Sequence, residues 1–244
     1  MATWVLGDIH GCASELERLV DELALGPGDR LVSVGDLFHR GPDPLGVARC
    51  LARVGCRWIL GNHERVALAR FGLAPRESDA SDAERTTEAR PQHASELAGD
   101  GERPLVAAPA DLPELLAFLL THEGYFLEHT DLGANPTPDG RAWCLVHAGL
   151  VPGLAPVAST PFELTRIRRL DRPGRPAWYD VYAGPTLVLF GHTPFDEPRR
   201  VEHEGRLVAL GLDTGCVFGG RLTAYSPELE RFVSVPAERA WARR

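Results

Sequence analysis

The stretch WVLGDIHGCASELERLVDEL (Trp4–Leu23) contains a strand, a glycine turn and a helix in succession. Its first three residues are apolar, as in a strand that is buried on both faces. From residue 13 onward, leucine and valine recur three and four positions apart, which predicts an amphipathic helix. A strand that leads into a helix in this way is the first half of a βαβ unit, in which the strands lie parallel.

The same pattern occurs twice more in the first third of the chain. A strand at 31–34 precedes a helix that begins at Pro44, and a strand at 58–60 precedes a helix at 64–70. A further apolar helix is expected at 112–120. The last third is rich in strands, which are expected at 142–146, 186–190, 206–212, 221–225 and 231–235. Short turns separate the final three strands, which predicts an antiparallel meander.

These elements predict a single α/β domain over residues 1–244. Residues 74–110 differ from the rest because they are rich in Ala, Glu, Asp, Arg, Ser and Pro and show little apolar periodicity. Long segments of this kind are often surface insertions over a functional face. We therefore expect an inserted cap or loop region at about 74–122.

The composition excludes several classes of protein. A net charge of −8 argues against extended binding of nucleic acid through a broad basic face. The chain has no apolar run of the roughly 18 residues that span a bilayer, and its first residues lack the pattern of a signal peptide. We therefore expect a cytoplasmic protein that has no contact with a membrane. Five dispersed cysteines without a CxxC pair indicate reduced thiols.

All 26 basic residues are arginines. The absence of lysine excludes a P-loop lysine, a Schiff base and a lysine general base. Any phosphate group must therefore be bound by arginine, by a metal ion or by backbone N–H groups.

Six of the expected strands end in a similar way, in VLGDIHG, SVGDLFHRG, ILGNHE, LVHAG, LFGHT and LGLDTG. Each strand stops at or near a glycine that has Asp, Asn or His beside it. One such residue is usually a turn former or a helix cap, but capping does not explain why six strand ends carry metal-binding residue types. Ligands of α/β sheets bind at the carboxyl ends of the strands, so we expect these side chains to form one site.

The residue types at these strand ends predict a metal centre. Imidazole nitrogen together with carboxylate and amide oxygen suits Mn²⁺, Fe or Zn²⁺ better than Ca²⁺ or Mg²⁺. The candidate ligands are too many for one ion, which favours two ions that share a bridging carboxylate. Two adjacent cations are the usual machinery of phosphoester hydrolysis.

The motifs also resemble the signature of the calcineurin-like metallophosphoesterases, in particular the branch of serine/threonine protein phosphatases and diadenosine tetraphosphatases. They are GDIHG (Gly7–Gly11), GDxxxRG (Gly35–Gly41), GNHE (Gly61–Glu64), HAG (His147–Gly149) and GHT (Gly191–Thr193). The segment LDTGCVFGGRLTA (Leu212–Ala224) resembles the bacterial members, including the phosphatase domain of bacterial polynucleotide kinase-phosphatase.

The resemblance implies a four-layer αββα sandwich of two mixed sheets flanked by helices. It also implies two divalent metal ions, with Mn²⁺ expected first and Fe, Zn²⁺, Ni²⁺ or Co²⁺ as alternatives. The ligands that it implies are Asp8 and His10 for the first ion, Asp36 as the bridge, and Asn62, His147 and His192 for the second ion.

The resemblance further implies that Arg40, Asn62 and His63 bind the substrate. Arg40 would hold the phosphate oxygens as a fork, and His63 would protonate the leaving group. Asp213 lies on the sixth strand end and is expected to orient the substrate or a metal ligand. A turn-forming Asp before Thr-Gly is nearly as good an interpretation of that residue.

His39 departs from the pattern of the protein phosphatases, which usually read GDxxDRG where this chain reads GDLFHRG. The usual Asp favours the protonated form of the histidine that matches His63, and a second imidazole cannot do so. We therefore expect His63 to be a weaker general acid and the substrates to have good leaving groups, as nucleotide anhydrides do. Simple packing of His39 at the rim is the alternative.

These patterns predict a dinuclear-metal-dependent phosphoesterase that hydrolyses phosphate monoesters or nucleotide phosphoanhydrides such as diadenosine tetraphosphate, by attack of a metal-activated hydroxide. The expected partner is a small phosphate or nucleotide substrate. The alternatives are a serine/threonine protein phosphatase with a phosphoprotein substrate, a phosphoesterase for nucleic-acid ends or 2′,3′-cyclic phosphates, and a catalytically silent phospho-recognition protein. Five arginines cluster at 165–175, and we interpret them as a solvated face, with a polyphosphate patch near the site as the alternative.

Overall fold

Two five-stranded sheets form the centre of the computed structural model, which describes residues 1–73 and 110–244. The strands of the first sheet are β1 (Thr3–Leu6), β2 (Arg30–Ser33), β3 (Arg57–Trp58), β9 (Arg221–Ser226) and β10 (Arg231–Pro236). The strands of the second are β4 (Phe126–Glu128), β5 (Trp143–Val146), β6 (Leu187–Phe190), β7 (Arg199–His203) and β8 (Arg206–Gly211). The spatial orders are β10-β9-β1-β2-β3 and β4-β5-β6-β8-β7. Both sheets are mixed. In the first sheet, β1 is parallel to β2 but antiparallel to β9, and in the second, β8 is parallel to β6 but antiparallel to β7.

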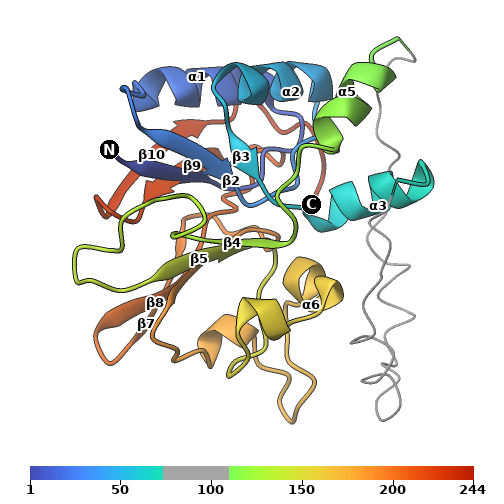
Figure 1. Cartoon of the computed structure of the whole chain (residues 1–244). Helices are drawn as coiled ribbons and strands as arrows, with labels where there is room; N and C mark the ends of the chain where they lie inside the picture. The colour runs from blue at the N-terminus through green and yellow to red at the C-terminus, as the bar shows by residue number, and fades with distance from the viewer. Residues whose placement is uncertain (74–109) are drawn as a thin grey trace.

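The sheets pack face to face through one apolar layer (Figure 1). Successive side chains of a strand point to opposite faces of the sheet. In β1, Val5 therefore packs with Leu189 and Leu210 of the second sheet, while Trp4 and Leu6 pack on the outer face. This alternation explains why the strand reads as an uninterrupted apolar run.

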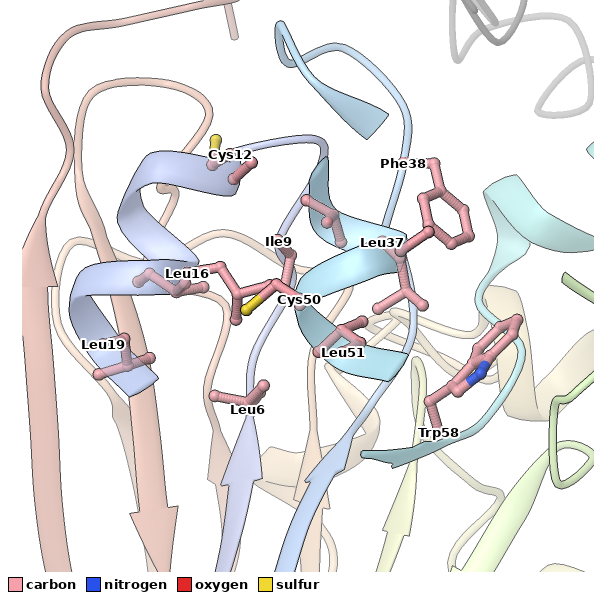
Figure 2. Packing of buried hydrophobic residues seen from close by; sticks show 14 of the residues in the cluster. Leu6, Ile9, Cys12, Leu16, Leu19, Leu37, Phe38, Cys50, Leu51 and Trp58 are labelled. Carbon is pink, nitrogen blue, oxygen red and sulfur yellow. The ribbon is translucent and has the colours of Figure 1, made fainter. Parts of the chain in front are cut away.

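Helices cover the outer faces of both sheets (Figure 1). They are α1 (Ala13–Leu23), α2 (Pro44–Arg53), α3 (Asn62–Arg70), α5 (Leu112–Leu119), α6 (Pro161–Arg166) and the 3₁₀ helices η2 (Pro156–Ala158) and η3 (Trp178–Asp180). Leu16 of α1 and Leu51 of α2 pack in the same cluster as Leu6 of β1 (Figure 2). On the other side, Leu164 of α6 and Trp178 of η3 belong to the cluster that covers the outer face of β5 and β6. The predicted αββα sandwich is confirmed.

The expected meander at the C-terminal end is wrong. β8 lies in the second sheet, parallel to β6, whereas β9 and β10 form a hairpin in the first sheet. The segment between β8 and β9, residues 212–220, carries the chain from one sheet to the other, and local sequence pattern does not report such a crossing. The short edge strands β4 and β7 were not expected either, because β7 reads RRVEH and has little apolar character.

The expected cap falls largely on residues 74–109, outside the described residues. At its far end, α5 packs on the helical layer through Leu115 and Leu119. Within the described residues, no helix combines the length and the apolar character that a bilayer crossing requires.

A network around Asp36 fixes the loops that follow β1, β2 and β3. The carbonyl oxygen of Asp36 accepts hydrogen bonds from the N–H groups of Ile9 (3.2 Å) and His10 (2.8 Å). The N–H of Asp36 donates to Glu64 Oε2 at 2.8 Å. Glu64 is completely buried and also accepts from the N–H groups of Leu37 (2.9 Å) and Gly61 (3.1 Å). One carboxylate thus joins two strand-end loops.

We expect Glu64→Gln to destabilise the protein. An amide nitrogen in place of one carboxylate oxygen would face at least one buried backbone N–H, and leaving such a donor unsatisfied costs about 1–3 kcal/mol. The free energy of unfolding in urea should fall by about this amount.

Glu114→Gln is the matched control, because Glu114 is exposed and accepts hydrogen bonds from Arg49 at the surface. Exposed pairs of this kind contribute little to stability. Equal losses for the two variants would contradict the role assigned to Glu64.

Candidate active site

The polar residues of the six strand ends meet at one edge of the two sheets. They are Asp8, His10, Asp36, His39, Asn62, His63, His147, His192 and Asp213, which are all buried, and the half-buried Arg40. Seven of them line a single pocket, namely His10, Asp36, Arg40, Asn62, His63, His192 and Asp213. The gathering of strand-end residues that the sequence predicts is therefore present.

Asp36 belongs to two groups of metal-ligating atoms. Ligand atoms of His10, Asp36 and His63 lie within 4.8 Å of one another, and so do those of Asp36, His147 and His192. The distances from Asp36 Oδ2 are 3.6 Å to His10 Nε2 and 3.4 Å to His147 Nε2. Asp36 is thus the residue that the two groups share, and the bridging role that the resemblance implies for it stays a prediction.

Asn62 completes the second group. Its Oδ1 atom lies 3.0 Å from His147 Nε2 and 3.0 Å from His192 Nδ1. The orientation of the His147 ring is fixed by its other nitrogen, because Nδ1 lies 2.9 Å from the carbonyl oxygen of Val34. Asn62 is the first residue of α3, so the start of that helix positions the side-chain amide of Asn62 in the site.

Asp8 lies at the edge of the first group. Its Oδ2 is 3.9 Å from His10 Nε2, and both carboxylate oxygens accept from the backbone N–H of His192, at 3.1 and 3.0 Å. A Cβ atom at Gly191 would lie 2.0 Å from Asp8 Oδ1, so only glycine allows this approach. The contact joins the end of β1 to the end of β6, across the two sheets.

Several of these residues have strained backbones. His10, Asp36, Arg40 and His192 have φ values of 50°, 53°, 76° and 66°, in the left-handed region. This region costs a residue with a Cβ roughly 1–2 kcal/mol. Such outliers are concentrated at functional sites, where the surrounding fold holds them.

The charges of the site favour a bound cation. Burial and the nearby charges of Asp213 and Asp36 raise the pKa of Asp8 well above its usual value. Burial and the charge of Asp36 also raise the pKa of Glu64 to about 7. Burial has the same effect on Asp36, but the positive charges of His147 and His63 outweigh it and hold the pKa of Asp36 well below its usual value. Carboxylates crowded among imidazoles in a buried site form a donor set that fits divalent metal ions.

His39 lies beside His63, with 4.8 Å between the ring centroids. Burial, and next to it the charge of His63, lower the pKa of His39 to about 3, so this imidazole is neutral near pH 7. Within the described residues, its Nδ1 atom has no hydrogen-bond partner. His39 thus occupies the position beside His63 that the sequence assigns to it.

Besides Pro194, three pocket residues were not among the site residues expected from the sequence. Phe218 comes from the segment after β8, and Arg244 from the C-terminal segment. Arg168 belongs to the arginine cluster, and it donates to the carbonyl oxygen of His192 at 3.3 Å while also lining the pocket. Its neighbour Arg169 instead donates to the carbonyl oxygen of Arg175, in an exposed position.

From the sequence alone, Glu64 indicates only an acidic residue that favours the start of a helix. Glu64 does accept a hydrogen bond from the backbone N–H of Gly61, the N-cap residue of α3, but it also accepts one from the backbone N–H of Asp36. The glutamate three residues after the N-cap was the available signal, since that position can accept from the N-cap backbone N–H. No local pattern marks Phe218 or Arg244, since tertiary structure alone brings them to the pocket.

Comparison with known proteins agrees with this geometry. Residues 1–220 match the sequence model of the family described as calcineurin-like phosphoesterase. The asymmetrical bis(5′-nucleosyl)-tetraphosphatase PrpE of Oceanobacillus iheyensis is 29% identical over 249 residues, which cover 95% of this chain and 90% of the relative. The protein of the same name from Geobacillus sp. is 32% identical over 253 residues, with coverage of 96% and 93%.

Among solved structures, a candidate diadenosine tetraphosphatase is 26% identical and has a TM-score of 0.67, with coverage of 96% of this chain and 93% of the other. The family match extends over most of the chain, and the relatives are similar over nearly their whole length. The chain therefore belongs to the calcineurin-like phosphoesterase family and is a metal-dependent hydrolase of phosphate esters or anhydrides.

Proposed function

We propose that this hydrolase acts on nucleotide phosphoanhydrides with several phosphates, such as bis(5′-nucleosyl) tetraphosphates. The observation that carries the proposal is the lining of the pocket, to which Arg40, Arg168 and Arg244 belong together with the carboxylates and imidazoles near Asp36. A phosphate monoester has a single anionic group for the three guanidinium groups. A polyphosphate chain has several phosphate groups, so each guanidinium could bind a different one. The names of the similar proteins support the same substrate class.

Two divalent ions, with Mn²⁺ as the expected metal, would be held by the strand-end residues. Asp8 and His10 would bind one ion, Asn62, His147 and His192 the other, and Asp36 both. When bound, such ions supply positive charge to the phosphoryl oxygens and acidify the attacking water.

The side chains of the chain itself would hold the substrate. Arg40 is suited to the reacting phosphate because its Nη1 atom lies 3.5 Å from His10 Nε2 and its guanidinium lies 5.5 Å from the centre of the Phe218 ring. The ring restricts the orientation of the guanidinium, which then donates in a fixed plane. Arg168 and Arg244 are exposed at the rim and would bind the phosphates further along the chain.

His63 would protonate the leaving group. Its backbone N–H donates to Asp36 Oδ1 at 3.2 Å, which fixes the start of α3 over the site. His39, which is neutral, does not strengthen the acid as a carboxylate would. A leaving group that departs as a nucleotide phosphate needs little protonation, so the pair favours anhydrides over alkyl esters.

We expect Arg168→Ala and Arg244→Ala to weaken the binding of polyphosphates selectively. Each variant should raise KM for diadenosine tetraphosphate by about tenfold, the equivalent of one charged hydrogen bond, while KM for p-nitrophenyl phosphate stays the same. Initial rates with Mn²⁺ at several substrate concentrations measure this.

Arg169→Ala is the matched control, because Arg169 belongs to the same cluster but is not among the residues that line the pocket. Equal effects of Arg168→Ala and Arg169→Ala would remove the support for the polyphosphate subsite. Failure of the wild-type protein to hydrolyse diadenosine tetraphosphate faster than the aryl ester would reject the proposed substrate class.

His39→Asp should extend the range of leaving groups. A carboxylate beside His63 would favour the protonated imidazole and should raise kcat/KM for a phosphoserine peptide relative to diadenosine tetraphosphate. A gain of about a hundredfold in this ratio is the expected size of general-acid assistance at its lower end.

The neutral variant His39→Asn separates charge from size in this experiment. It should leave the ratio of the two kcat/KM values near that of the wild type. If the aspartate and asparagine variants show the same ratio, His39 has no influence on the protonation of His63.

A further inference from the structure

A third group of metal-ligating side chains lies among residues that do not line the pocket. Cys12 precedes α1, Glu15 is in its first turn, and Cys216 follows β8. The two sulfur atoms and a carboxylate oxygen all lie within 4.8 Å of one another. Cys12 and Glu15 have no exposed surface, and Cys216 is 1% exposed. Figure 2 shows Cys12 at the start of α1.

Only one of the two carboxylate oxygens of Glu15 has hydrogen-bond partners among the described residues. Its Oε1 atom accepts from the backbone N–H of Glu238 at 2.9 Å and from Trp241 Nε1 at 3.2 Å. Within residues 1–73 and 110–244, its Oε2 atom has no hydrogen-bond partner. A fully buried carboxylate oxygen without a partner is costly, and a cation bound beside it would remove that cost.

We propose that Cys12, Glu15 and Cys216 bind a soft divalent ion, with Zn²⁺ as the best match. Sulfur ligands select Zn²⁺, whereas the nitrogen and oxygen donors around Asp36 also accept Mn²⁺. The thiols bind as thiolates, so each releases one proton to solvent when the ion enters. Three protein donors leave the fourth position of a tetrahedral site to the second oxygen of Glu15 or to a water molecule.

The ion would join three segments that the pocket needs. Cys12 follows the loop that carries His10, and Cys216 follows Asp213. Glu15 also anchors the C-terminal segment through Trp241, and this segment carries Arg244 to the pocket. The site is therefore structural, separate from the group around Asp36, and the inference does not rest on the proposed substrate.

Cobalt is a suitable probe, because thiolate ligands give Co²⁺ a charge-transfer band in the near ultraviolet. The metal-free, full-length protein is titrated with Co²⁺ in the presence of a non-thiol reductant. The wild type should develop this band, with saturation at about one thiolate-bound ion per chain, and Zn²⁺ should abolish it by displacement.

Variants assign the band to its ligands. Cys12→Ser and Cys216→Ser should each lower its intensity by about half, and the double variant should lack it. Asp36→Asn should keep the band, which separates this site from the phosphoesterase centre. Cys56→Ser is the matched control and should also keep it, since Cys56 is outside the cluster.

The wild-type titration is decisive even if the serine variants do not fold. A reduced wild-type protein without the band would overturn the proposal, and so would a band that persists in the folded double variant. A Cys12–Cys216 disulfide in the purified protein, detected by mass spectrometry, would also overturn it if reduction did not produce the cobalt band.

Discussion

The site depends on the way Asp36 is held by its neighbours. Its carbonyl oxygen accepts hydrogen bonds from N–H groups of the loop after β1, and its own N–H donates to Glu64. Its carboxylate accepts a hydrogen bond from the backbone N–H of His63. Three strand-end loops are thereby fixed to one residue, whose φ of 53° is itself unfavourable. The same carboxylate then faces imidazoles from both sheets, so the backbone network and the ligand cluster have one centre.

The electrostatic consequence is a site with an excess of buried negative charge. Asp8, Asp213 and Glu64 each have a pKa raised by burial and by the charge of Asp36. Divalent ions between these groups would offset the repulsion, which agrees with membership of a metal-dependent family. Under the proposed function, the arginines at the rim would supply positive charge beyond the reach of the ions, and would bind the phosphates other than the reacting one.

Much of this architecture could be predicted from the sequence, because the strand ends carry local signals. Apolar runs that stop at Gly-Asp, Gly-Asn or Gly-His mark both the strand and its functional end, and the helices have clear periodicity. The pairing of β8 could not be predicted, since the choice between two sheets is made by tertiary packing. Arg244 and Phe218 could not be predicted as pocket residues for the same reason. Glu64 could not be predicted as a site residue because its position at the start of a helix explains it locally, whereas its hydrogen bonds to the loop after β2 depend on tertiary structure.

The central claim is that Asp36 is shared by two metal ions, and electron paramagnetic resonance of the Mn²⁺-loaded protein tests it most directly. Two Mn²⁺ ions bridged by one carboxylate interact magnetically, so the account predicts the spectrum of an exchange-coupled pair at low temperature. Asp36→Asn should replace this spectrum by that of isolated ions. A wild-type protein that shows only isolated Mn²⁺ at every metal-to-protein ratio would contradict the account.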